Sequence, residues 1–365
     1  MRIGVNALYL IPGGVGGTEI YLRNLLAAMA EIDPTNQWFL ITNQETGATL
    51  SPPAPNFQSL TQSLRAQVRP WRLFWEQTGL PTLARDLKLD VLLNPGFTSP
   101  FFSPCPTVTV FHDLQHKRHP EYFRWWDLPF WQFFLYWSAR RSARLIAVSD
   151  ATRDDLLHFY PMDPGRISVI PHGVEEAFFD IGRRRRQSDP FVLCVSTLHP
   201  HKNLDRLVRA FRRVPSHRLV ITGLRGFHTE GLERTIAQCG MADRVRLTGW
   251  IPRTALLALF EKASAFIYPS TFEGFGMPVL EALAAGLPSA VSDIEPMRSI
   301  AGGAALLFDP HSEDAIVGAV AHLLSDTELR NQLAEAGPRR AAQFRWQDTA
   351  ARTLAVLQEA AAAGQ

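Results

Sequence analysis

Residues 268–288 read YPSTFEGFGMPVLEALAAGLP, and this order predicts a strand, a loop and a helix in close succession. Pro278 suits the first turn of a helix, and Gly286 suits the position just past its end. Glu273 is therefore expected in the loop and Glu281 on the helix. A strand that feeds a helix through a short glycine-containing loop is typical of parallel α/β sheets, where ligands bind beyond the carboxyl ends of the strands.

The loop and the helix after it have the features of an anion-binding site. A helix N-terminus offers free N–H groups and a positive dipole end to a diphosphate, and Gly274 and Gly276 let the backbone approach a ligand closely. Glu281 stands among apolar neighbours, so a partly buried carboxylate needs polar partners there, and ribose hydroxyls would supply them. The alternative is that Glu281 faces solvent and that the glycines only shape a turn.

The alternation of strand-like runs and helical patterns extends along the whole chain. Residues 2–10 form a β-type run, residues 11–17 are glycine-rich, and the apolar residues that follow have helical spacing: Leu22, Leu25, Leu26 and Met29. A second series starts at residues 191–197. It continues with the helix face Leu204, Leu207, Val208 and Phe211, and with strands at 219–222, 245–248, 265–270 and 289–292.

A chain of 365 residues exceeds the usual size of a single core. We expect an α/β fold with two Rossmann-like domains, residues 1–174 and 175–345, and a C-terminal helix 346–363 that packs back on the first. The polar stretch with arginines at 183–186 lies just beyond this boundary.

Composition excludes several classes of protein. The 46% apolar and 20% charged fractions are those of an ordinary globular protein, and a net charge of +2 predicts no nucleic-acid partner. Cys105, Cys194 and Cys239 are odd in number and widely spaced, which argues against a disulfide framework or a zinc site and fits a reducing cytoplasm. The first residues lack the features of a signal peptide, so we expect no export by that route.

The glycine loop at 13–17 is ambiguous by itself. Similar loops occur in dinucleotide dehydrogenases and as plain turns. A dehydrogenase places an acidic residue on a ribose about 20 residues further along, but residues 38–42 read WFLIT and offer none. The dehydrogenase hypothesis is therefore disfavoured.

In its full context, the Glu273 to Glu281 spacing closely resembles the signature of glycosyltransferase family four, the retaining enzymes of the GT-B fold. The likeness runs from Arg2 to about Trp346 and includes four further segments: GGVGGTE at 13–19, FHD at 111–113, PHGV at 171–174 and VSTLHPHKNL at 195–204. The resemblance implies two Rossmann-like domains that face across a cleft. The N-terminal one would serve the acceptor, and the C-terminal one would bind the nucleotide sugar.

The resemblance assigns Glu273, His112 and Lys202 to catalysis. Glu273 would orient sugar hydroxyls, and His112, at a strand end, would contact the transferred sugar; the alternative for His112 is a structural histidine that caps the strand. Lys202 precedes Asn203, a good N-cap, so its ammonium would stand beside a helix N-terminus and hold diphosphate charge. The alternative is a solvated lysine.

The donor site implied by the resemblance includes residues of both domains: Gly16, Gly17, Thr197, His201, Lys202, Phe275, Gly276, Met277 and Glu281. Thr197 and His201 stand where many family members carry an arginine and a second basic residue.

The implied activity is transfer of a hexose with retention. The donor would be a nucleotide diphosphate sugar, with GDP-mannose as the best match, and the acceptor a glycan or lipid-linked molecule of surface polysaccharide synthesis. The sequence lacks Asp-x-Asp, and His116 and His119 have no carboxylate spaced to complete a metal set, so we expect neither metal nor cofactor. A GT-B-type sugar-nucleotide epimerase and a non-catalytic binding module are the alternatives.

Residues 122–137 hold ten aromatics among sixteen, flanked by several arginines: Arg118, Arg124, Arg140, Arg141 and Arg144. Phe130, Phe133, Phe134 and Trp137 have helical spacing and could form core. The competing interpretation is an amphipathic patch that meets anionic head groups beside a lipid-linked acceptor. The arginines at 183–186 could add to it or form a solvated linker. We expect a cytoplasmic protein, with peripheral contact at the inner membrane face as a further hypothesis.

Overall fold

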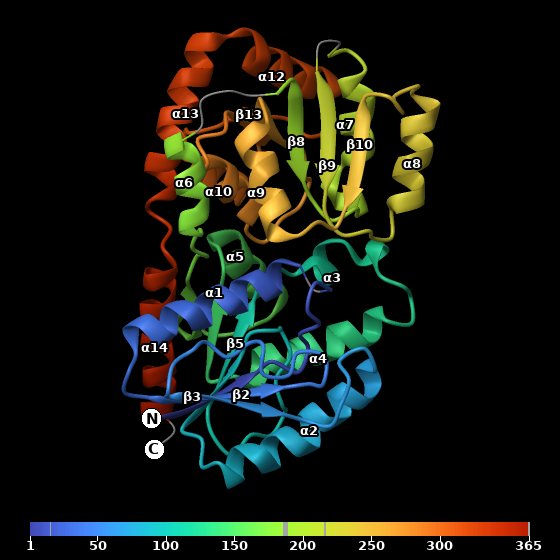
Figure 1. The fold of residues 1–365 in the computed structure, drawn as a ribbon. Coiled ribbons are helices and arrows are strands. Elements are labelled where there is room, and N and C mark those ends of the chain that lie inside the picture. Colours follow the sequence, from blue (N-terminus) through green and yellow to red (C-terminus); the bar gives the residue numbers. More distant parts are fainter. Residues whose placement is uncertain (15, 185–188, 215–216, 364–365) are drawn as a thin grey trace. The chain divides into compact units, whose positions relative to one another are not determined.

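The computed structural model describes residues 1–14, 16–184, 189–214 and 217–363 (Figure 1). The chain divides into two units, Met1–Gly173 with Trp346–Gln365, and Val174–Arg345. The sequence placed the division one residue further along, after residue 174. Val15 of the glycine loop, and Arg185 and Arg186 of the polar stretch, lie outside the described residues.

The first unit is built on a seven-stranded parallel sheet in the order β3-β2-β1-β4-β5-β6-β7. Its strands are β1 (Arg2–Asn6), β2 (Gln37–Thr42), β3 (Phe57–Thr61), β4 (Val91–Asn94), β5 (Thr107–Phe111), β6 (Arg144–Ala147) and β7 (Ile167–Val169). β1 ends at Asn6, earlier than the expected Leu10, because the chain turns after Asn6. The side-chain amide of Asn43 donates to the carbonyls of Leu8 and Leu10 in this turn, at 2.9 and 2.7 Å.

The helical segments of the first unit are α1 (Gly17–Ile32), α2 (Arg69–Asp86), α3 (Gln115–Arg118), η1 (Pro120–Tyr122), α4 (Leu128–Arg141), α5 (Asp150–Phe159), η2 (Pro164–Arg166) and α14 (Trp346–Ala363). The predicted apolar face of α1 is buried. α14 crosses α1 and packs against it, so the C-terminal helix belongs to the first unit (Figure 1).

The core interpretation of the aromatic segment holds for only part of α4, where Phe134 packs against the buried cluster of the first unit. The fully buried side chains of α4 are Leu135, Ser138 and Ala139, whereas Phe133 is 51% exposed. Leu135 and Ala139 belong to the same buried cluster as Leu145 and Ala147 of β6, and Phe134 packs against this cluster from its margin.

The second unit is built on a six-stranded parallel sheet in the order β10-β9-β8-β11-β12-β13. Its strands are β8 (Phe191–Val195), β9 (Arg218–Thr222), β10 (Val245–Gly249), β11 (Ala265–Tyr268), β12 (Ser289–Ser292) and β13 (Leu306–Phe308). The expected strands are confirmed, although β8 and β11 end two residues earlier than predicted.

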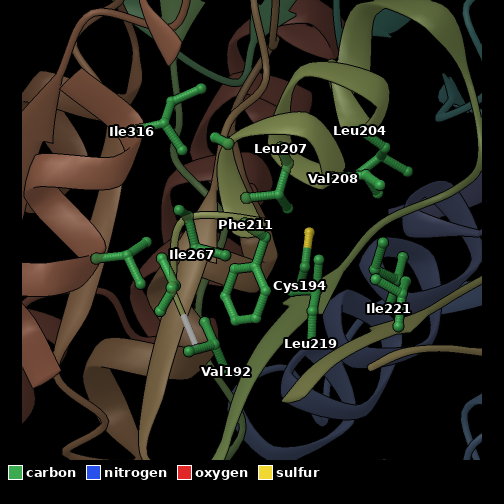
Figure 2. Packing of buried hydrophobic residues seen from close by; sticks show 14 of the residues in the cluster. Val192, Cys194, Leu204, Leu207, Val208, Phe211, Leu219, Ile221, Ile267 and Ile316 are labelled. Carbon is green, nitrogen blue, oxygen red and sulfur yellow. The ribbon is translucent and has the colours of Figure 1, made fainter. Parts of the chain in front are cut away.

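The helical segments of the second unit are α6 (Glu176–Arg184), η3 (Pro200–Lys202), α7 (Leu204–Phe211), α8 (Thr229–Gln238), α9 (Arg253–Lys262), α10 (Met277–Ala284), α11 (Met297–Ala301), α12 (Glu313–Ser325) and α13 (Thr327–Ala341). Alternate strand residues such as Val192, Cys194 and Ile267 lie in one buried cluster with side chains of α7 and α12 (Figure 2). Phe266 packs instead on Phe260 of α9, 6.0 Å between ring centroids.

Both sheets share one topological feature. The strand order reverses between β1 and β4 in the first unit and between β8 and β11 in the second. In doubly wound sheets the loops that leave such a pair of strands diverge and form the crevice where ligands bind. The loops after β8 and β11 are therefore where chemistry is expected in the second unit.

Within the described residues, every helix is too short or too polar to cross a membrane.

Candidate active site

Lys202 and Glu273 meet at the point of strand reversal in the second unit. Lys202 ends the short η3 turn after β8, and Glu273 lies in the loop after β11. Their Nζ and Oε1 atoms are 2.5 Å apart, and the side chains are only 13% and 10% exposed. The same ammonium donates to the Tyr268 hydroxyl at 3.2 Å. Burial, and then the Glu273 charge, raise the pKa of Tyr268, so this phenol stays protonated.

Asn203 does not cap the next helix in the predicted way. It occupies the N-cap position of α7 in the left-handed conformation, with φ 57°, and its side chain makes no cap hydrogen bond. Its side-chain nitrogen, Nδ2, donates instead to the carbonyls of Pro269 and Pro310, at 3.0 and 2.7 Å. Asn203 thus ties the loop after β8 to the loop after β11, which brings Lys202 to Glu273.

Helix α10 begins beside Glu273 as the sequence predicted. No side chain caps it, and Gly276 precedes it with φ 107°. This φ favours glycine, and a Cβ atom at Gly276 would lie 2.2 Å from Cε of Met297, so a larger residue would also displace the end of that side chain. Phe275 is buried, with its ring centroid 6.3 Å from that of Phe344. A ligand could therefore contact Phe275 through its backbone but not through its ring. Met277, the first residue of the helix, is partly buried.

Glu281 is buried and paired, so the solvent-facing alternative is wrong. Its side chain is 8% exposed, and Oε1 accepts from Nη2 of Arg253 at 3.0 Å. The same Nη2 contacts Glu175. Burial raises the pKa of Glu281 to about 7, with Glu175 adding to the shift and Arg253 opposing it. The sequence led us to expect ribose hydroxyls as the polar partners of Glu281, but Arg253 of the protein is already one such partner.

Sequence reasoning missed Arg253 and Glu175. Arg253 is the first residue of α9, directly after a strand and a Gly-Trp-Ile-Pro turn, and Glu175 follows the PHGV segment. A charged residue just after a strand or just after the PHGV segment could have been noted as a candidate. Its position does not reveal that Arg253 pairs with Glu281, 28 residues away, and with Glu175, 78 residues away.

Thr197 and His201 occupy the loop after β8. Thr197 is exposed, and Nδ1 of His201 lies 2.7 Å from Nδ1 of His199. Burial, with the nearby Lys202 and His228 charges, lowers the pKa of His199 to about 4, so its ring is neutral near pH 7. His199 was not among the predicted site residues.

In the first unit the glycine loop leads into α1. Gly16 precedes the helix with φ 61°, and Gly17 is its first residue. The Gly13 backbone nitrogen donates to Oε2 of Glu19 at 2.7 Å, so a carboxylate of the first helical turn holds the loop.

His112 directly follows β5 and is buried. Its Nε2 lies 2.9 Å from the Pro95 carbonyl, which can only accept, so Nε2 carries the proton. Burial lowers the pKa of His112 to about 4, which keeps the ring neutral with Nδ1 unprotonated. Tyr21 and His172 pack around it, with ring centroids 4.9 and 5.6 Å away.

The structure therefore gathers Lys202, Glu273, Gly276 and Glu281 within the second unit, while Gly16, Gly17 and His112 belong to the first. Over the described ranges, no three His, Cys, Asp or Glu side chains are grouped as metal ligands would be. His116 contacts the Tyr160 hydroxyl at 2.7 Å, and His119 contacts Glu121 at 2.9 Å. Metal independence stays a prediction.

Two family models match the chain: Glycosyltransferase Family 4 over residues 15–178, and Glycosyl transferases group 1 over residues 177–340. The chain is similar to O-antigen chain mannosyltransferase B of Escherichia coli, with 27% identity over 284 residues that cover 74% of each protein.

Two solved structures show the same fold at 18% identity. Sucrose-phosphate synthase from Thermosynechococcus elongatus has a TM-score of 0.82, with 100% of both chains covered. The Anabaena protein HepE, solved with UDP and glucose, has a TM-score of 0.74, with 97% and 99% covered. The expected α/β fold of the GT-B type, with two Rossmann-like domains, is confirmed.

Proposed function

This chain belongs to the glycosyltransferases that the family 4 and group 1 models describe, and on that premise we propose that it transfers mannose, with retention, from a nucleotide diphosphate sugar. The contact between Lys202 and Glu273 at the strand reversal of the second unit carries the proposal, because it joins a cation for the diphosphate to a carboxylate for the sugar. The similarity to an O-antigen mannosyltransferase supports mannose and a glycan or lipid-linked acceptor in surface polysaccharide synthesis.

Lys202 is suited to hold the charge that develops on the departing diphosphate. An ammonium has three N–H donors, and within the described residues oxygens of Glu273 and Tyr268 accept two of them. The third is left for a phosphate oxygen. The N-terminus of α10 adds backbone N–H groups and a positive dipole end, so the leaving group meets preorganised positive charge without a metal ion.

Glu273 and His112 are proposed to position the sugar. The Glu273 carboxylate accepts hydrogen bonds from sugar hydroxyls while Lys202 fixes its orientation. His112 is neutral, so its unprotonated Nδ1 accepts a hydrogen bond from a sugar hydroxyl, and the ring does not act as an acid near pH 7. Retention requires the acceptor oxygen to bond the anomeric carbon on the face that the phosphate oxygen leaves.

Glu281 is proposed to bind the ribose, with Arg253 as a positioning residue. Arg253 holds one carboxylate oxygen of Glu281 and is itself held by Glu175. The other oxygen is then directed toward a ribose hydroxyl. Gly16 and Gly17, at the start of α1, would approach the donor through their backbone.

A thermal-shift panel of nucleotide sugars tests the donor directly. A ligand at about 100 times its dissociation constant adds about 2.7 kcal/mol of stability, and we expect GDP-mannose to give the largest shift. The anomeric configuration of the product, read by NMR, then tests retention. No shift with any nucleotide sugar, or conversion of the donor to its epimer without acceptor, would contradict the proposal.

A further inference from the structure

The first unit carries a set of exposed large apolar side chains, which we call the aromatic face. Its members come from α2 and the residue before it, from the loop after β4, and from α4 and the turn before it: Val68, Trp71, Phe74, Phe102, Trp125, Trp126, Phe133 and Tyr136. Trp125 and Phe102 are 80% and 73% exposed. Single exposed apolar residues are ordinary, but a contiguous group of this kind marks an interaction surface.

Contacts join the elements that carry the aromatic face. The guanidinium of Arg69, on α2, lies 4.1 Å from the ring centroid of Trp131 and 5.1 Å from that of Phe130, both on α4. Arg69 also pairs with Asp127 at 3.4 Å. α2 and α4 therefore lie side by side in the lower part of Figure 1.

The loop after β4 completes the surface. The Phe101 ring lies 5.5 Å from Phe133 and 5.3 Å from Phe134, so this loop packs on α4. The next residue, Phe102, is exposed, and the guanidinium of Arg141 lies 5.4 Å from both its ring and that of Trp137. Sequence reasoning found only the α4 part, because α2 and this loop are distant in the chain.

The charge around the aromatic face is almost entirely positive. Residues 65–75 and 122–141 together contain six arginines and one carboxylate, Asp127, which already pairs with Arg69. Arg124, Arg140 and Arg141 are exposed. Arginines beside tryptophan and phenylalanine match the interface of an anionic bilayer, where rings enter the head-group region and guanidinium groups meet lipid phosphates.

We infer that the aromatic face docks the protein on an anionic lipid surface. This interaction needs neither donor nor transfer, since Lys202 and Glu273 belong to the other unit. The protein could therefore fail to bind vesicles and still transfer a sugar, or bind vesicles and transfer none. A second copy of this chain is the competing occupant, but the exposed like charges of Arg124, Arg140 and Arg141 would oppose such pairing.

Sedimentation with vesicles of phosphatidylglycerol and phosphatidylcholine tests the inference on the full chain. We expect wild type to bind phosphatidylglycerol vesicles, and to bind phosphatidylcholine vesicles far more weakly. The combined Trp71→Ser, Trp125→Ser and Trp126→Ser variant should bind at least about tenfold more weakly, because three large apolar groups no longer leave water. Arg140→Gln and Arg141→Gln, made singly, should each lower the affinity for phosphatidylglycerol vesicles about fivefold, and the loss should be smaller at high salt.

Trp250→Ser is the matched control, because Trp250 is 59% exposed but belongs to the second unit. It should bind vesicles like wild type, and circular dichroism should show every variant folded. The inference is overturned if wild type ignores phosphatidylglycerol vesicles, or if Trp250→Ser loses binding as far as the triple variant. It is equally overturned if sedimentation velocity shows a dimer that the triple variant dissolves while vesicle binding persists.

Discussion

Glu281 couples the proposed ribose site to pH. Burial and the Glu175 charge raise its pKa to about 7 in the folded protein, above its ordinary value of 4.5. The folded chain therefore holds a proton that the unfolded chain releases, and stability from this group is present below pH 4.5 and is lost as pH rises through 7.

The Glu281→Gln variant should lack this dependence. Between pH 4.5 and 8, wild type should lose on the order of 3 kcal/mol of unfolding free energy relative to the variant, from about 1.4 kcal/mol for each unit of pKa difference. Urea unfolding of both proteins at pH 5 and 8 measures it. A gap between them that stays constant with pH would show that Glu281 titrates normally.

Helix α10 depends on the glycine that precedes it. Gly276→Ala imposes φ near 107° on a residue with a Cβ and presses that atom on the Met297 side chain. Gly303→Ala is the matched control, because Gly303 has φ 85° with nothing within 4 Å of its Cβ position.

Both variants should lose about 1–2 kcal/mol through backbone strain, and Gly276→Ala about 1 kcal/mol more through crowding. Met297 is itself buried, so Met297→Ala costs core packing of its own, but in a double-mutant cycle Gly276→Ala should cost about 1 kcal/mol less in the Met297→Ala background than in wild type. Chemical denaturation gives the comparison, and equal losses in the two glycine variants would refute the packing role of Gly276.

The elements that sequence predicted well are those with local signals. α1 follows from the spacing of its buried leucines, and α10 from Pro278 inside its first turn and Gly286 past its end.

What sequence could not supply depends on neighbours distant in the chain. Asn203 has an ideal N-cap side chain, yet the carbonyls of Pro269 and Pro310 compete for it. The Arg253 contact with Glu281 exists only because α9 and α10 lie in one unit, and no periodicity encodes that. For α4, spacing identified a shared aromatic face but not whether another element covers it.

For the molecule as a whole, transfer should proceed without a metal ion. Charge neutralisation is assigned to Lys202 and the α10 N-terminus, so excess EDTA should leave the rate of transfer largely intact. Rates measured before and after chelation check this on the same preparation. A rate that collapses and returns only with Mg²⁺ or Mn²⁺ would show that a metal ion holds the diphosphate.

The two units should contribute differently to binding and turnover. Lys202 and Glu273 are in the second unit, so nucleotide diphosphate affinity should depend on that unit, and Lys202→Ala should lower it about 10- to 100-fold. Glu273→Gln removes a negative charge beside the proposed diphosphate position and frees the Lys202 ammonium. Affinity for the nucleotide diphosphate should therefore not fall in that variant.

Turnover of Glu273→Gln, measured beside its nucleotide diphosphate affinity by calorimetry, decides whether the Glu273 carboxylate acts in transfer. The side chain keeps its size and polarity, but loses the charge that orients the sugar. The account predicts that transfer slows by about 10²–10³-fold, the loss typical of one preorganised transition-state contact, with affinity undiminished. Near wild-type turnover in a folded Glu273→Gln protein would contradict it.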